Sequence, residues 1–258
     1  MTSLARLFAV LFSLISMTYT FYVVGKLMIF LSLPKTVPLA SKWIFSLLDN
    51  KSRLETSYGP IALDTLLLIG FIFQHSLMKS EILKKIFKIF KLEVLERSIY
   101  CMTSSLCLHY LVNNWQSAQS VILWQFNVEE SALLWWTVVV IHTYAWIVIY
   151  GGSIILDLPE ILGIKQTYYN AKNLGTPISY KSNQLSALYS HVRHPSFISF
   201  FVIFWITNLM SLDRLILSVL LTAYMYLAWS PDKRDYEYQK AQLNAKTREL
   251  QCIRLKRF

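Results

Sequence analysis

A run of 19 uncharged residues, Leu7 to Gly25, follows the first arginine of the chain, Arg6. An α-helix needs about 20 mostly apolar residues to cross the roughly 30 Å hydrocarbon core of a bilayer. A secretory signal peptide has a shorter apolar core, of about 7–15 residues, and a cleavage site of small residues after it. The run is longer than such a core and no such site follows it. It therefore predicts a first membrane-spanning helix that the protein retains.

Five further segments are apolar and long enough, or nearly long enough, to cross a membrane. The six predicted spans are Leu4–Leu31, Ile61–Met78, Ser98–Trp115, Ala132–Leu156, Ser196–Leu212 and Leu215–Trp229. Only Asp213 and Arg214 separate the last two, which predicts a tight helical hairpin. Charged residues make up 16% of the chain, against about 25% of a soluble domain. The sequence predicts an all-α, polytopic transmembrane helix bundle of about six spans, with residues 1–258 in a single domain.

The lysines and arginines are distributed unevenly between the two sides of this arrangement. Of 25 basic residues, 19 lie in the N-terminus, 79–97, 157–194 and the tail after Trp229, and five lie in the connections on the opposite side. Short loops that are rich in lysine and arginine stay on the cytosolic side of a membrane. Both termini are therefore expected to face the cytosol or nucleoplasm, and the net charge of +10 is expected to attract anionic lipids.

Two of the basic segments have helical patterns. In 79–97, apolar residues recur at helical spacing with lysines between them: Ile82, Leu83, Ile86, Phe87, Ile89 and Phe90. This pattern predicts a basic amphipathic helix in the membrane interface, or alternatively a loop helix packed on the spans. The basic tail, 230–258, is also expected to be helical and to contact anionic lipid, chromatin or a filament protein. Nothing in it resembles a module that reads bases, so specific nucleic-acid recognition is not expected.

Ionisable and polar residues lie inside several predicted spans. They are Asp64, Gln74, His75, His109 and His142. Such groups are costly in hydrocarbon and are therefore candidates for functional sites. The alternative is that they only join neighbouring helices by hydrogen bonds, as we expect for His142, one turn from Trp146. A proton or metal role for the histidines is the functional alternative.

The segment before the fifth span carries the densest set of chemically useful residues. It contains Tyr189, His191, Arg193 and His194, followed by Pro195, which suits the first position of a helix. Because no carboxylate or cysteine lies beside the two histidines, no metal site is predicted. A helix N-terminus next to an arginine favours an anion, such as a carboxylate or a phosphate. Alternatively, Arg193 anchors the helix at the interface by meeting lipid phosphates.

The tripeptide Arg193-His194-Pro195 before a hairpin of short spans resembles a family of membrane methyltransferases that includes isoprenylcysteine carboxyl methyltransferase. In that family the segment forms an S-adenosylmethionine pocket with acidic residues that follow the last span. The resemblance implies that Tyr189, Arg193 and His194 would bind this cofactor. Asp232 and Asp235, which stand where the family has glutamates, would complete the pocket. It assigns no catalytic residue and no acceptor substrate.

A second resemblance, to the nurim family of nuclear-envelope membrane proteins, extends over almost the whole chain. It rests on the order and spacing of several short stretches: Gly59-Pro60, Asp64, Gln74–Ser76, Lys165–Tyr169, Ser190–Pro195, Asp213–Leu215, Asp232–Asp235 and Ala241–Leu243. This resemblance implies a six-span protein held tightly in the inner nuclear membrane. For such a protein we expect a structural or scaffolding role, with the nuclear lamina or chromatin as candidate partners. The resemblance implies no established enzymatic activity or cofactor, and it leaves the oligomeric state open.

Overall fold

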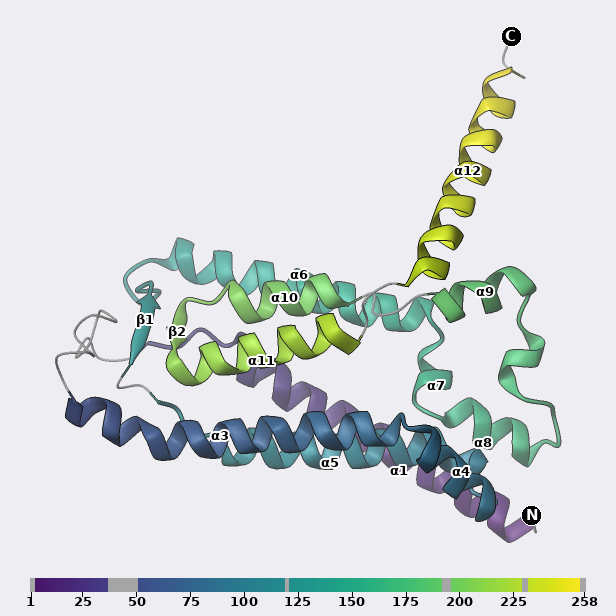
Figure 1. Ribbon diagram of the computed structural model, residues 1–258, viewed down its shortest axis with the longest axis horizontal. Coiled ribbons are helices and arrows are strands. Elements are labelled where there is room, and N and C mark those ends of the chain that lie inside the picture. Colours follow the sequence, from purple (N-terminus) through teal and green to yellow (C-terminus); the bar gives the residue numbers. More distant parts are fainter. Residues whose placement is uncertain (1–2, 37–50, 119–120, 192–195, 229–231, 256–258) are drawn as a thin grey trace.

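A computed structural model describes residues 3–36, 51–118, 121–191, 196–228 and 232–255 (Figure 1). Its longer helices are α1 (Ser3–Ser32), α3 (Lys51–Met78), α5 (Glu96–Asn114), α6 (Ala132–Ile155), α11 (Leu212–Ala228) and α12 (Lys233–Leu255). The shorter ones are α4 (Glu81–Ile89), α7 (Leu158–Ile161), α8 (Ile164–Ala171), α9 (Asn183–His191), α10 (Phe197–Trp205), and the 3₁₀ turns η1 (Glu93–Leu95) and η2 (Pro177–Tyr180). Two short strands, β1 (Ile122–Gln125) and β2 (Leu209–Ser211), are the other elements of these described residues. This architecture confirms the predicted all-α class.

Three helices of the described chain have both the length and the composition of a membrane span. They are α1, the Glu55–Met78 part of α3, and α6. A fourth would require α11 and 233–249 of α12 to form one broken span. The charges of α12 oppose that arrangement, because lysine, arginine, aspartate and glutamate are costly within hydrocarbon. The helices α5 and α11 lie where the sequence predicts two further spans.

The outer faces of the spanning helices are apolar and uncovered. Large exposed side chains include Phe8 on α1, Phe73 on α3, and Tyr144 and Ile155 on α6, with exposed fractions between 66% and 79%. A soluble monomer rarely shows apolar patches of this extent. These faces therefore contact lipid, and the protein is a membrane protein.

The hairpin near the C-terminus differs from its prediction. Its first helix, α10, ends at Trp205, and α11 begins at Leu212, so Asp213 and Arg214 lie in the first turn of α11 rather than between the helices. Between them, β2 pairs antiparallel with β1, with Trp124 opposite Met210 and Gln125 opposite Leu209. Residues 206–211 are uncharged, and for this reason the span predicted from composition continued through them. The pairing with a distant strand ends it instead.

The helices pack into a bundle around α1 and α5. Helix α1 lies along α5, α3 packs on α5 and α11, and α6 packs on α10. Hydroxyl groups join α1 to α5, since Ser16 Oγ donates to Ser98 O at 2.8 Å and Ser105 Oγ to Thr20 Oγ1 at 3.0 Å. Small residues let helices approach closely inside a membrane, where interhelical hydrogen bonds add to van der Waals contact. These serines are buried for that reason.

The bundle has two different ends (Figure 1). The first turns of α1, together with α4, α8 and α9, lie at one end. We call it the basic end because its segments, together with the tail after Trp229, carry 19 of the 25 lysines and arginines. The strands β1 and β2 lie at the opposite end with the first turns of α3, and we call this the strand end. Helix α12 leaves the bundle and projects away from it.

At the basic end, the segment from α7 to α8 folds back onto the spans. Ser13 Oγ of α1 lies 2.8 Å from Thr167 Oγ1 of α8, and both residues are buried. The turn before α8 passes close to α5, and Gly163 makes this possible with a φ of +88°. A Cβ at this glycine would lie 2.5 Å from Ser98 Oγ and 2.7 Å from Ser98 N. Only glycine combines this backbone conformation with this close approach.

We predict that Gly163→Ala destabilises the protein, because it adds both left-handed backbone strain and a clash with the backbone of α5. The strain alone costs on the order of 1 kcal/mol, which corresponds to a melting temperature lower by at least about 2–4 °C. Thermal unfolding of a fluorescent fusion in detergent, followed by size exclusion, measures this change. Gly152→Ala is the matched control, because a Cβ at this helical glycine meets nothing within 4 Å. Equal melting temperatures for the two variants would show that the turn does not need glycine.

Candidate functional site

The residues predicted to bind a cofactor lie on both sides of the α10–α11 hairpin. Tyr189 belongs to α9, but its side chain lies outside the described residues. Arg193, His194 and Pro195 also lie outside them. Asp232 and Asp235 stand at the start of α12, and α9 packs against α12. The fold therefore brings together the two elements that carry Tyr189 and the aspartates, while the arginine and histidine stay predictions.

The two aspartates cap the start of α12. The backbone N–H of Asp235 donates to Asp232 Oδ1 and the N–H of Asp232 donates to Asp235 Oδ2, both at 2.9 Å. This reciprocal pair has the geometry of a capping box, with aspartate in place of the usual glutamate at the third position. Both negative charges also interact favourably with the positive end of the helix dipole. The pair therefore stabilises the start of α12, where Asp235 has an exposed fraction of 1%.

Two carboxylates hold the chain at the strand end. Asp213 Oδ2 accepts a hydrogen bond from Trp115 Nε1 at 2.9 Å, and its Oδ1 accepts from the backbone N–H of Ala118 at 3.2 Å. Asp64 of α3 accepts from the N–H of Gln116 at 2.9 Å. Asp64, Ala118 and Asp213 are all buried. The backbone that leaves α5 therefore finds its acceptors in two other helices.

The neighbouring arginine of α11 holds the end of α1. The guanidinium of Arg214 donates to the carbonyls of Phe30 and Leu31 and lies 4.6 Å from the centre of the Phe30 ring. Helix α1 has no basic residue in its own last turn. Arg214 supplies a positive charge there, which stabilises the free carbonyl groups and the negative end of the helix dipole.

Further contacts at this end join the segment after α1, and also α6, to the connection between α10 and α11, and join α6 to α1. Asn208 Nδ2 donates to Lys35 O at 2.7 Å, and Lys35 N donates to Asn208 Oδ1 at 3.2 Å. His142 of α6 lies with its Nε2 2.6 Å from Ile206 O, and Trp146 Nε1 donates to Ser32 Oγ at 2.8 Å. With Asp64, Asp213 and Arg214, these residues form what we call the strand-end network. Most of its hydrogen bonds end on backbone N–H or carbonyl groups, which fits the helix-joining alternative.

The other polar residues predicted inside spans also join helices. His109 lies between α1 and α5, with its Nδ1 2.6 Å from Tyr19 Oη and its Nε2 3.0 Å from Lys26 Nζ. His75 Nε2 lies 2.8 Å from Tyr100 Oη, between α3 and α5. Gln74 of α3 donates to Thr103 of α5 at 3.1 Å. Each contact fits the helix-joining alternative to a functional role.

Sequence reasoning missed the role of Asp213 and Arg214, which it placed in a turn. Their adjacency at the start of an apolar run was an available signal, since an acidic residue is favoured in the first turn of a helix. It also missed Asn208 and Trp115, which look like ordinary residues at the ends of apolar segments. Their partners are more than 90 positions away along the chain. No local pattern identifies such pairs.

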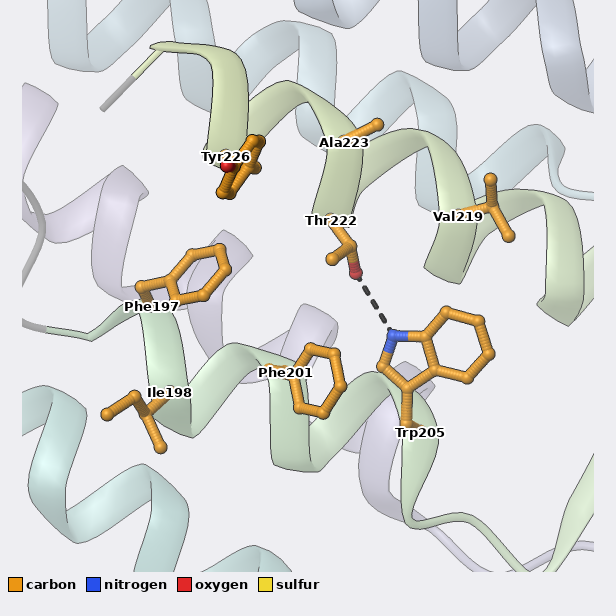
Figure 2. A pocket seen from close by; sticks show the side chains of 8 residues that line it. All are labelled: Phe197, Ile198, Phe201, Trp205, Val219, Thr222, Ala223 and Tyr226. Carbon is orange, nitrogen blue, oxygen red and sulfur yellow. Dashed lines mark hydrogen bonds between the residues drawn. The ribbon is translucent and has the colours of Figure 1, made fainter. Parts of the chain in front are cut away.

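A groove of about 540 Å³ lies between α10 and α11 (Figure 2). Its lining consists of Phe197, Ile198, Phe201, Trp205, Val219, Thr222, Ala223 and Tyr226. None of these eight side chains is charged, and the hydroxyl of Thr222 accepts from Trp205 Nε1 at 3.1 Å (Figure 2). The groove therefore suits an apolar chain rather than a charged cofactor.

We predict that Asp213→Ala destabilises the protein, because it leaves Trp115 Nε1 and the Ala118 N–H without their acceptor. Each buried donor that loses its partner costs about 1–3 kcal/mol, so the melting temperature should fall by at least about 4 °C. Asp213→Asn, which keeps one carbonyl acceptor, should lose less. Glu130→Ala, an exposed acidic residue before α6, is the control. A melting temperature of Asp213→Ala equal to that of Glu130→Ala would contradict the structural role of this network.

Comparison with known proteins gives matches over most of the chain. A protein named Nurim homolog from Drosophila melanogaster is 58% identical over 252 residues, covering 98% of this chain and 100% of the relative. Nurim of Danio rerio is 38% identical over 190 residues, covering 72% and 68% of the two chains. Nurim of Sus scrofa is 33% identical over 207 residues, covering 79% and 76%. No family model and no solved structure gives a significant match. The chain is a multi-pass membrane protein and belongs to the nurim family.

Proposed function

We propose that this protein is a structural component of the inner nuclear membrane, with its basic end and both termini in the nucleoplasm. The observation that carries the proposal is the segregation of charge, since 19 of 25 basic residues lie in the segments assigned to one side. The start of α1, α4, α8 and α9 lie together at one end of the bundle (Figure 1). Positively charged connections stay on the side of the membrane from which the chain is inserted. Membership of the nurim family supports the nuclear location.

Helix α12 is the element best suited to contact a partner in the nucleoplasm. It spans 23 residues, or about 35 Å at 1.5 Å per residue, and projects from the bundle (Figure 1). Most of its described residues are exposed, and its basic residues include Lys240, Lys246 and Arg248. A long, exposed, basic surface favours a negatively charged partner. We assign the nuclear lamina or chromatin to this role, with contact to phosphate or carboxylate groups rather than to base edges.

Helix α4 supports a second attachment, to the membrane surface. Among the apolar residues of α4, Phe87 is buried and Leu83 is partly buried against the bundle. Ile82, Ile86 and Ile89 are 41–75% exposed. A helix packed only on its own spans would hide these residues. The interfacial alternative accounts for them, because the apolar face enters the acyl boundary while the lysines meet anionic lipid.

The scaffolding role is tested by lateral mobility. A fluorescent full-length chain is expected at the nuclear rim, with slow and incomplete recovery after photobleaching. The charge reversal Lys240→Glu/Lys246→Glu/Arg248→Glu should raise the mobile fraction several-fold, because α12 loses its electrostatic attraction to an anionic partner.

The matched control is Gln239→Ala/Gln242→Ala/Asn244→Ala, which changes three exposed residues of the same helix without changing its charge. This variant should recover as slowly as the unchanged chain. If the charge-reversed chain and the control recover equally, α12 is not the tether. Rapid, complete recovery of the unchanged chain would end the scaffolding proposal.

The second candidate function is S-adenosylmethionine binding, with methyl transfer as the chemistry. The observation that favours it is the packing of α9 against α12. Tyr189 belongs to α9, and Asp232 and Asp235 cap the start of α12. In methyl transfer a protein mainly positions donor and acceptor, so a pocket between two helix ends would serve. Against it, both aspartates already have partners in the helix cap.

Calorimetric titration of the purified protein with S-adenosylmethionine tests this candidate. It predicts saturable binding that is lost in Arg193→Ala and weakened in Asp235→Asn. The asparagine keeps an acceptor for the helix cap, so a lost signal would report on the ligand and not on unfolding. Arg248→Ala, far along α12, is the control and should bind normally. A flat titration up to millimolar cofactor removes the candidate.

A further inference from the structure

A small polar cavity lies at the basic end, where α3, α4 and α5 meet. Its volume is about 300 Å³, at the lower limit of ligand sites in proteins. The lining residues are Met78, Lys79, Lys84, Glu96, Arg97 and Tyr100. They come from the end of α3, the first turn of α4 and the first turns of α5. The size suits the headgroup of a lipid rather than a whole lipid molecule.

The cavity walls carry an excess of positive charge. Three cationic side chains, Lys79, Lys84 and Arg97, face one carboxylate in the lining, Glu96. Lys84 also pairs with Glu81 at 2.7 Å, outside the cavity. Partial burial and then the nearby charge of Arg97 lower the pKa of Lys79. A bound anion would relieve both effects, because it would offset the repulsion between Lys79 and Arg97 and replace lost hydration.

The position of the cavity relative to the membrane is set by the helices around it. The apolar part of α3 ends at Met78, so the cavity begins where this span leaves the hydrocarbon. Beside it, the exposed apolar residues Ile82, Ile86 and Ile89 of α4 extend the lipid-facing surface. Tyr100, which also lines the cavity, is held by its hydrogen bond to His75. The cavity therefore lies at the level of the lipid headgroups, and its outer rim borders acyl chains.

We propose that Lys79, Lys84 and Arg97 bind the phosphate group of an anionic phospholipid in the leaflet at the basic end. Arginine and lysine are the usual partners of phosphate oxygens, with arginine able to donate two parallel hydrogen bonds. A phosphate that enters from the leaflet leaves its acyl chains beside α4. The inference deepens the proposed function and rests on it, since it requires the basic end to face an anionic leaflet.

The test uses the purified full-length chain in mild detergent, titrated with a fluorescent phosphatidic acid. Phosphatidylcholine with the same label, and inorganic phosphate as competitor, are the other two arms. The unchanged chain is expected to bind phosphatidic acid saturably and phosphatidylcholine much more weakly. Lys79→Gln/Arg97→Gln should weaken binding of phosphatidic acid at least about tenfold, since two charges near the phosphate are removed.

The matched control is Lys88→Gln/Lys91→Gln, which removes the same charge from the same basic segment. Both of its residues are exposed and neither lines the cavity. The control should bind phosphatidic acid within about twofold of the unchanged chain. Lys84→Gln, a single change on the surface of α4, serves if the first double variant does not fold, and should weaken binding about fivefold.

Three outcomes would overturn the inference. Equal weakening by the two double variants would show general attraction to a basic surface without a site. Full displacement of the lipid by micromolar inorganic phosphate would show that the cavity takes a soluble anion. Equal binding of phosphatidic acid and phosphatidylcholine would show that the cavity does not select an anionic headgroup over a zwitterionic one. None of these results depends on nuclear location, so they leave the tethering role of α12 to be judged by photobleaching.

Discussion

The bilayer interior offers no water, and this constraint governs how polar groups are placed in the spans. A polar side chain there needs a hydrogen-bond partner on its own helix or on a neighbouring one, because an unpaired one costs several kcal/mol in hydrocarbon. Lys26 illustrates the rule, since its ammonium lies 3.0 Å from His109 Nε2 and donates to Asn113 at 2.9 Å. His75 and Gln74 meet Tyr100 and Thr103 in the same way. Such contacts determine which helices pack together and how far each is shifted along the axis of its neighbour.

The two ends of the bundle differ in how their polar and apolar groups are used. At the strand end, connections leave the helices with free backbone groups, and Asp64, Asp213 and Arg214 take them up. At the basic end, the chain returns to the membrane surface, where Gly163 brings the turn before α8 against α5 and α4 turns apolar side chains outward. The strand end is therefore closed by internal contacts, whereas the basic end exposes charged and apolar side chains.

Composition and periodicity predicted the helices because long apolar runs leave few alternatives, and the amphipathic pattern placed α4 within residues 79–97. They did not predict where α10 ends, since residues 206–211 are as uncharged as the helix before them, and strand pairing acts over more than 80 positions. For the site, resemblance drew attention to Asp232 and Asp235, and only the geometry gave them a capping role. The cavity formed by Lys79, Lys84 and Arg97 depends on the angle between three helices, which no local pattern encodes.

Glycosylation mapping tests the orientation of the bundle most directly. An Asn-Ser-Thr acceptor with flexible spacers is inserted between Glu129 and Glu130 at the strand end, or between Leu174 and Gly175 at the basic end. Both variants carry Asn50→Gln, which removes the natural acceptor Asn50-Lys51-Ser52. We predict a glycan, removable by endoglycosidase, on the first variant alone, because the proposed orientation places only the strand end in the lumen. A glycan on the second variant would contradict it.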